Sequence, residues 1–182
     1  MSHAVALRPA VFLDRDGTVI EDRGHLSEAS EVAFYPDAID ALQRLQERFL
    51  LFLVTNQPWV ARGILTPADV DRVNAWVVAH LAEHGVIITA VYVCPHERSD
   101  GCSCIKPKPY FLRKAAAEYD VDLPRSFTVG DHPHDVEFAR SVGARGVYVR
   151  TGHGSKHVGE LAPGEVVTAG IAEAADWILR AS

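Results

Sequence analysis

Two aspartates stand two residues apart directly after a short apolar run, in the segment VFLDRDGT. Asp14 can attack a phosphoryl group and form an aspartyl-phosphate, which divides one difficult displacement into two easier steps. Asp16 can protonate the leaving oxygen and then accept a proton from the hydrolytic water. Mg²⁺ is the natural cation to offset the charge of these acids and of a phosphate, because it prefers hard oxygen ligands. Taken alone, the pair is equally consistent with an ordinary strand-to-loop turn.

A second group of residues has the composition of a metal site. Cys94, His96, Cys102 and Cys104 supply three thiols and one imidazole within eleven residues, which is a complete tetrahedral ligand set for a structural Zn²⁺. The alternative is three reduced cysteines beside a surface histidine. A redox role is disfavoured because the segment has no Cys-x-x-Cys pair. The residues between these four are typical of turns, and they are too polar to form a stable loop without a bound metal.

The elements that must position these residues alternate between short apolar runs and longer amphipathic segments. Strands are expected at residues 10–13, 49–54, 86–93, 127–129 and 146–149. Helices are expected at residues 36–48, 67–85, 110–119, 133–142 and 171–180, and Thr66 with Asp69 resembles a capping box for the second of them. This order predicts an α/β fold: a doubly wound, Rossmann-like parallel sheet with helices on both faces.

The residues that could do chemistry fall at the carboxyl ends of the expected strands. In open parallel sheets, ligands bind at this edge, at the point where the strand order reverses. Asp14, Thr55 with Asn56, Cys94 and Asp131 all follow such strand ends. The coincidence favours one shared site over unrelated turns, although each short segment alone is more often a turn, a helix cap or a solvated side chain.

With these motifs in this order, the sequence resembles the haloacid dehalogenase (HAD) superfamily. The resemblance implies that the Thr55 hydroxyl and the backbone N–H of Asn56 hold the transferring phosphoryl group. It also implies that Lys106 balances the charge around the nucleophile. Mg²⁺ would be bound by Asp14, Asp16 and Asp131, and Asp135 would be either a further ligand or the partner of Lys106.

The segments CPHERSDGCSCIKPKPY and TNQPWVARG resemble a small, capless branch of that superfamily, subclass III. This branch contains D-glycero-D-manno-heptose 1,7-bisphosphate phosphatases and histidinol-phosphate phosphatases. The resemblance implies a Mg²⁺-dependent phosphomonoester hydrolase with a zinc-stapled loop. The expected substrate is a small sugar phosphate, foremost heptose 1,7-bisphosphate, from which the 7-phosphate is removed. Without a large cap domain, three loops must recognise the leaving group: residues 21–33, 57–63 and 94–106.

One residue departs from the branch in a way that bears on substrate choice. Branch members often have arginine directly after the last cysteine, as a contact to substrate phosphate, and here that residue is Ile105. A second phosphate on the substrate needs a cation to offset its charge. Arg62, which we predict to bind substrate, and Arg98 are the candidates to replace it. If neither reaches the site, monophosphates such as histidinol phosphate would be handled relatively better.

Size and composition restrict the remaining alternatives. The 182 residues suit a single phosphatase domain spanning residues 1–182, and 48% hydrophobic residues are enough for a core. The net charge of -6, without a basic stripe, disfavours nucleic-acid partners and hence a polynucleotide 3′-phosphatase. A non-enzymatic phospho-acceptor module would not need Asp16. The expected partner is therefore a small phosphorylated metabolite.

The expected location is the cytoplasm, and the expected state is a monomer that contacts no membrane. No apolar run approaches the roughly 20 residues of a membrane span. The N-terminal segment MSHAVALRPA lacks the apolar core of a signal peptide. The three clustered cysteines point to metal binding in a reducing compartment rather than to disulfides.

Overall fold

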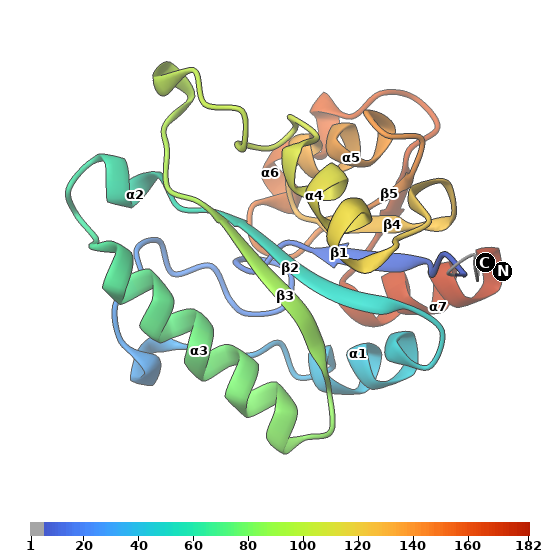
Figure 1. Ribbon diagram of the computed structural model, residues 1–182, viewed down its shortest axis with the longest axis horizontal. Coiled ribbons are helices and arrows are strands. Elements are labelled where there is room, and N and C mark those ends of the chain that lie inside the picture. The colour runs from blue at the N-terminus through green and yellow to red at the C-terminus, as the bar shows by residue number, and fades with distance from the viewer. Residues whose placement is uncertain (1–5) are drawn as a thin grey trace, which may run out of the picture.

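A single six-stranded sheet forms the centre of the computed structural model, which describes residues 6–182 (Figure 1). Residues 1–5 lie outside the described part, and with them half of the segment MSHAVALRPA, which was predicted not to be a signal peptide. All neighbouring strands are parallel, in the order β3-β2-β1-β4-β5-β6. The strands are β1 (Ala10–Leu13), β2 (Leu50–Asn56), β3 (Ile88–Cys94), β4 (Phe127–Gly130), β5 (Arg145–Val149) and β6 (Val166–Thr168).

The central strands are apolar on both faces, as strands covered by helices on both sides must be. Every residue of β1 and β4 is buried. The register pairs Leu13 with Leu53 and with Val129, so β1, β2 and β4 end at a common edge. Strands β2 and β3 lie on one side of β1 and strands β4 to β6 on the other, so the strand order reverses at β1 and places the switch point of the sheet directly beside Asp14.

Helices cover both faces of this sheet (Figure 1). On one face, α1 (Ala38–Gln46), α3 (Pro67–Glu83) and α7 (Ile171–Ala181) bury their apolar sides in one core cluster. On the other face, α4 (Tyr110–Tyr119) and α5 (Pro133–Arg140) pack in a second cluster. The prediction of a doubly wound α/β sheet is confirmed. Between these elements the chain forms loops and short helical turns, and residues 6–182 contain no separate cap domain.

The predicted helices and strands agree with most observed elements, but the strand predicted at residues 49–54 ends two residues too early. The capping box is present: the Asp69 N–H donates to the Thr66 hydroxyl at 3.2 Å, and the Thr66 N–H donates to the Asp69 carboxylate at 2.8 Å. Strand β2 continues through Thr55 and Asn56, because both pair with β3. The sequence did not indicate β6, α2 (Pro58–Ala61) or α6 (Gly154–His157), which are only three or four residues long.

None of the helices described in residues 6–182 is both long enough and apolar enough to cross a membrane.

Candidate active site

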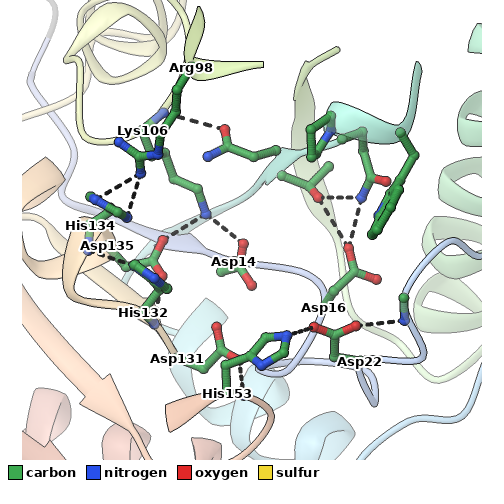
Figure 2. Close-up of a pocket in the computed structure, with 16 residues that line it drawn as sticks. Asp14, Asp16, Asp22, Arg98, Lys106, Asp131, His132, His134, Asp135 and His153 are labelled. Atoms are coloured by element: carbon green, nitrogen blue, oxygen red, sulfur yellow. Dashed lines mark hydrogen bonds and ion pairs between the residues drawn. The ribbon is translucent and has the colours of Figure 1, made fainter. Parts of the chain in front are cut away.

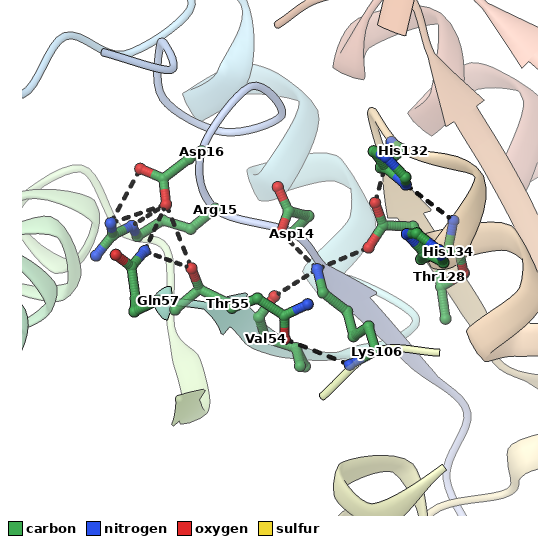
Figure 3. A network of polar contacts seen from close by, with 12 residues as sticks. Asp14, Arg15, Asp16, Val54, Thr55, Gln57, Lys106, Thr128, His132 and His134 are labelled. Carbon is green, nitrogen blue, oxygen red and sulfur yellow. Dashed lines mark hydrogen bonds and ion pairs between the residues drawn. The ribbon is translucent and has the colours of Figure 1, made fainter. Parts of the chain in front are cut away.

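Lys106 joins two acidic side chains at the carboxyl edge of the sheet (Figure 3). Its Nζ lies 2.5 Å from an Asp14 carboxylate oxygen and 2.7 Å from an Asp135 carboxylate oxygen. It also donates to the Val54 carbonyl at 3.1 Å, and the lysine is only 4% exposed. Three distant segments, the end of β1, the loop after β3 and the first turn of α5, therefore meet around one ammonium group.

Burial and charge act in opposite directions on these groups. Burial lowers the pKa of Lys106, but the charges of Asp135 and Asp14 raise it by more, so the ammonium stays protonated. Burial also raises the pKa of Asp14 well above its ordinary value, and nearby carboxylates raise it further against the effect of Lys106. Burial, with the charge of Asp135, raises the pKa of Asp131 to about 7. The site thus has more buried negative charge than one lysine balances.

The Asp131 carboxylate lies in a space that two glycines leave open. A Cβ at Gly17 would come within 2.1 Å of an Asp131 oxygen, and a Cβ at Gly152 within 2.2 Å of the same atom. Gly17 also has φ +86°, which favours glycine. The backbone N–H of His153 donates to this oxygen at 2.7 Å. The loop after β5 therefore helps to hold Asp131, a contribution that the sequence did not indicate.

The donor set at this edge fits Mg²⁺. Asp14 and Asp131 offer carboxylate oxygens, the ligands that Mg²⁺ prefers, and a cation bound there would offset the burial and the carboxylate repulsion that raise their pKa values. Asp135 is differently engaged, because one carboxylate oxygen accepts from Lys106 and the other from the His132 N–H at 3.1 Å. Of the two roles considered for Asp135, the geometry is that of a partner for Lys106.

Asp16 points into a cluster of donors of its own (Figure 3). The Arg15 guanidinium contacts both carboxylate oxygens, at 2.9 and 2.8 Å. The Gln57 side-chain amide donates to an Asp16 oxygen at 2.8 Å, and the Thr55 hydroxyl donates to the same oxygen at 3.3 Å. Arg15 is itself fixed by the Asn74 side chain of α3 at 2.6 Å. Thr55 also lines the cavity that contains Asp14, and the contacts of Arg15, Gln57 and Asn74 with this cluster were not predicted.

The side chains of Asn56 and Arg62, both predicted to bind substrate, have protein partners in the structure. The Asn56 side chain accepts from the Lys106 N–H at 3.3 Å, so it ties the lysine segment to β2. Arg62 forms an ion pair with Glu97, and its guanidinium stacks 4.9 Å from the Trp59 ring centroid. Arg62 does not line the cavity that contains Asp14, whereas Arg98 does.

A cavity of about 290 Å³ surrounds these acids and opens at the carboxyl edge of the sheet (Figure 2). Each of the three loops expected to recognise the leaving group contributes to its wall. Three histidines also line it: His132, His134 and His153. His25 instead packs against Trp59, at 5.5 Å between ring centroids. The lining residues from the three loops are Asp22, Gly24, Gln57, Pro58, Trp59, Arg98 and Lys106.

The Cys/His cluster is assembled at the end of β3. The ligand atoms of Cys94, His96, Cys102 and Cys104 all lie within 4.8 Å of one another. The Cys94 and Cys104 sulfurs are 3.1 Å apart, and the Cys104 sulfur is 3.3 Å from Nδ1 of His96. All three cysteines are free thiols. Three sulfurs and one imidazole nitrogen converging in this way fit a closed tetrahedral zinc site.

Comparisons with known proteins agree with this arrangement. A family model described as "HAD-hyrolase-like" matches residues 103–174. The chain is 38% identical to the D-glycero-beta-D-manno-heptose-1,7-bisphosphate 7-phosphatase of Yersinia pestis, over 94% of this chain and 90% of that protein. The corresponding protein of Escherichia coli K12 is 35% identical, over 94% of this chain and 88% of that protein. The chain belongs to the HAD-like phosphatases.

A solved structure extends this family assignment to three dimensions. The crystal structure of D,D-heptose 1,7-bisphosphate phosphatase from B. bronchiseptica, complexed with magnesium and phosphate, superposes with a TM-score of 0.87 at 33% identity. The match covers 96% of this chain and 99% of that chain. As a HAD-like phosphatase, the chain is an enzyme, and the predicted superfamily and branch are confirmed.

Proposed function

We propose that this HAD-like phosphatase hydrolyses the 7-phosphate of D-glycero-D-manno-heptose 1,7-bisphosphate, with Asp14 as the nucleophile. The observation that carries the proposal is the contact of Lys106 with both Asp14 and Asp135 beside Asp131, at the switch point of the sheet. This geometry presents a buried carboxylate, kept next to a fixed cation, to an open cavity. The named substrate follows from the relatives, which share more than a third of their residues with this chain.

In the first step, an Asp14 carboxylate oxygen attacks phosphorus. A bond forms between that oxygen and phosphorus, and the bond from phosphorus to the sugar oxygen breaks. Asp16 gives its proton to the leaving sugar oxygen. Lys106 stabilises the anionic form of Asp14, and the Thr55 hydroxyl and the Asn56 N–H hold the phosphoryl oxygens. In the second step, Asp16 takes a proton from water, whose oxygen attacks phosphorus and releases phosphate and free Asp14.

Mg²⁺ would be bound by Asp14 and Asp131, with Asp16 as the third predicted ligand, and it would neutralise charge on the transferring phosphoryl group. The excess of buried carboxylates supports this assignment. Zn²⁺ at Cys94, His96, Cys102 and Cys104 would fix the loop that ends two residues before Lys106. Its role is structural, because the four protein ligands leave no open position.

The proposal includes the setting in which the enzyme works. Its partner is a small phosphorylated sugar, because a 290 Å³ cavity accepts a metabolite and the net charge of -6 does not favour nucleic acid. We propose a single domain that acts as a monomer in the cytoplasm, a reducing compartment in which the three free thiols would stay reduced.

A phosphate-release screen tests the proposal. The substrates are heptose 1,7-bisphosphate, heptose 7-phosphate, histidinol phosphate and a 3′-phosphorylated oligonucleotide, each with added Mg²⁺. We expect the heptose bisphosphate to have the highest kcat/KM, and Asp14→Asn to abolish turnover without loss of fold. Preferred hydrolysis of histidinol phosphate would reassign the substrate, and substantial turnover by Asp14→Asn would exclude Asp14 as the nucleophile.

A further inference from the structure

A second cavity adjoins the one that contains Asp14. It has a volume of about 440 Å³ and reaches the zinc loop and the α2 turn. The two cavities share Asn56, Pro58 and Arg98 in their walls. Arg98, which lines the cavity that contains Asp14 (Figure 2), therefore also lies at its junction with the second cavity. The remaining residues around the second cavity are Arg62, Glu97, Ser99 and Ile105.

The lysine and the two arginines that line these cavities differ in how far their charge is balanced. Lys106 is matched by Asp14 and Asp135, and Arg62 is matched by Glu97. Within residues 6–182, Arg98 forms no ion pair with a carboxylate; its guanidinium contacts the His134 ring at 2.7 Å. Ile105, 8% exposed, brings no charge to the same wall. Arg98 is therefore the cation left for an anionic group of a ligand.

We infer that Arg98 binds the second phosphate of a bisphosphorylated sugar in the adjoining cavity and sets the preference for bisphosphates over monophosphates. This inference rests on the proposed function, since it concerns the part of the substrate away from the transferred phosphoryl group. A phosphate that leaves water needs charge-assisted hydrogen bonds, and the planar guanidinium can supply two at once. Arg98 thus does from the middle of the zinc loop what an arginine in place of Ile105 would do from its end.

Local backbone structure and a contact with His134 fix the position of Arg98. It begins a short helical turn, Arg98–Asp100, that lies between the metal ligands His96 and Cys102. The Asp100 carboxylate accepts from the Glu97 N–H at 2.9 Å, which closes that turn. His134, in the first turn of α5, contacts the guanidinium and so links the zinc loop to the helix that carries Asp135. His134 is accordingly a positioning residue for Arg98.

The test compares two substrates that differ only in the second phosphate. We would measure kcat/KM for heptose 1,7-bisphosphate and for heptose 7-phosphate with the wild type, Arg98→Ala and Arg62→Ala. Arg98→Ala should lower the bisphosphate-to-monophosphate ratio by about tenfold or more, the size of one hydrogen bond to a charged group. Arg62→Ala, which changes an arginine of the same cavity already paired with Glu97, should change the ratio by less than about twofold.

Two kinetic outcomes would overturn the inference: an equal loss on both substrates in Arg98→Ala, or a selective loss in Arg62→Ala alone. Binding separates this inference from the proposed function. In the Asp14→Asn background, which cannot turn over, titration calorimetry with the bisphosphate should show about tenfold weaker binding when Arg98 is also alanine. If the wild type hydrolyses neither sugar, the proposed function fails, and this binding difference alone decides the role of Arg98. Zinc content and circular dichroism would verify that each variant is folded.

Discussion

The guanidinium of Arg15 contacts both carboxylate oxygens of the neighbouring Asp16, from a side chain that is only 1% exposed. Its remaining nitrogen donates to Asn74 at 2.6 Å. The arginine thus connects the proposed general acid to helix α3. The position of the Asp16 carboxylate is therefore set by the packing of a helix and not only by the loop that carries it.

Arg15→Lys should impair the step that needs a proton on the leaving oxygen. Lysine keeps the charge and loses the two-pronged contact with Asp16. We expect kcat/KM for a sugar phosphate to fall about tenfold or more, within the range of general acid catalysis. The fall should be smaller for p-nitrophenyl phosphate, whose leaving group needs no proton. Arg72→Lys, an exposed arginine on the same helix, is the matched control. Equal losses on both substrates would contradict a role through Asp16.

Lys106→Met should destabilise the protein as well as inactivate it. Methionine has a side chain of similar length without the charge, so the substitution leaves Asp14 and Asp135 buried without their cation. Removing one partner of a buried ion pair costs about 3–5 kcal/mol. Urea unfolding would measure this loss. Lys114→Met, which breaks an exposed pair with Glu118, should cost less than about 1 kcal/mol. Comparable losses in both variants would show that Lys106 is not an electrostatic centre of the fold.

Asp131→Asn should stabilise the metal-free protein and remove its response to Mg²⁺. The folded protein raises the pKa of Asp131 from 3.8 to about 7, so ionising this group costs folding free energy. That cost grows as the pH rises from about 4 to 7 and is complete above 7. At pH 8 the metal-free variant should therefore be more stable than the metal-free wild type, by about 1–3 kcal/mol. The difference should shrink as the pH falls toward 4.

Thermal unfolding with and without Mg²⁺ tests whether Asp131 is a ligand of the metal. Mg²⁺ at 100 times its dissociation constant should stabilise the wild type by about 2.7 kcal/mol and Asp131→Asn far less. Asp71→Asn, at an exposed position on α3, should behave like the wild type in both respects. An unchanged Mg²⁺ response in Asp131→Asn would remove Asp131 from the ligand set.

Cys102→Ser should lose zinc and with it stability. Freshly purified, reduced wild type should contain about one zinc per chain and keep it under mild chelation, as a closed thiolate-rich site does. The serine variant should contain much less zinc and melt at least about 2–4 °C lower, the shift that 1 kcal/mol produces in a chain of this size. Ser103→Ala, at the exposed neighbouring position, is the control. Absence of zinc from the wild type would refute the structural site.

Ile105→Arg should raise kcat/KM for the bisphosphate by roughly tenfold and restore much of what Arg98→Ala loses. Both residues line the second cavity, so either guanidinium could meet the same phosphate. Ile105→Gln, of similar size without charge, separates the effect of charge from that of lost packing. No gain in either background would mean that residue 105 does not face the second phosphate.

Most of the fold followed from local patterns in the sequence. The apolar runs of β1 and β2 and the spacing on α1, α3 and α7 report burial residue by residue, so they predict elements well. Strand β6 has only three residues and lies at the sheet edge, too short for a periodic signal. The placement of Asp14 and Asp131 at one edge was expected from the ends of the predicted strands, and that of Lys106 from the motif it matches.

The contacts that complete the site were beyond such patterns, because they join residues far apart in the chain. Asn74 lies 59 residues from the Arg15 side chain that it fixes. His153 lies 22 residues after Asp131 and contributes only its backbone N–H, which no side-chain pattern reveals. Gln57 had a weak signal, since it follows Thr55 and Asn56 directly. Arg62 and Arg98 looked alike in the sequence, and only the partner of each, Glu97 or His134, distinguishes them.

The candidate zinc ligands all come from residues 94–104. The contacts of Lys106 reach much further along the chain, to Asp14, 92 residues earlier, and to Asp135. Contacts that are close in the chain form early, and distant ones must wait for the chain that supplies them. A nascent chain that has just passed α4 already contains its whole metal-binding loop. It still lacks β4 and α5, and with them Asp131 and Asp135. The four zinc ligands are therefore available early in synthesis, whereas catalysis must wait until β4 and α5 have been made.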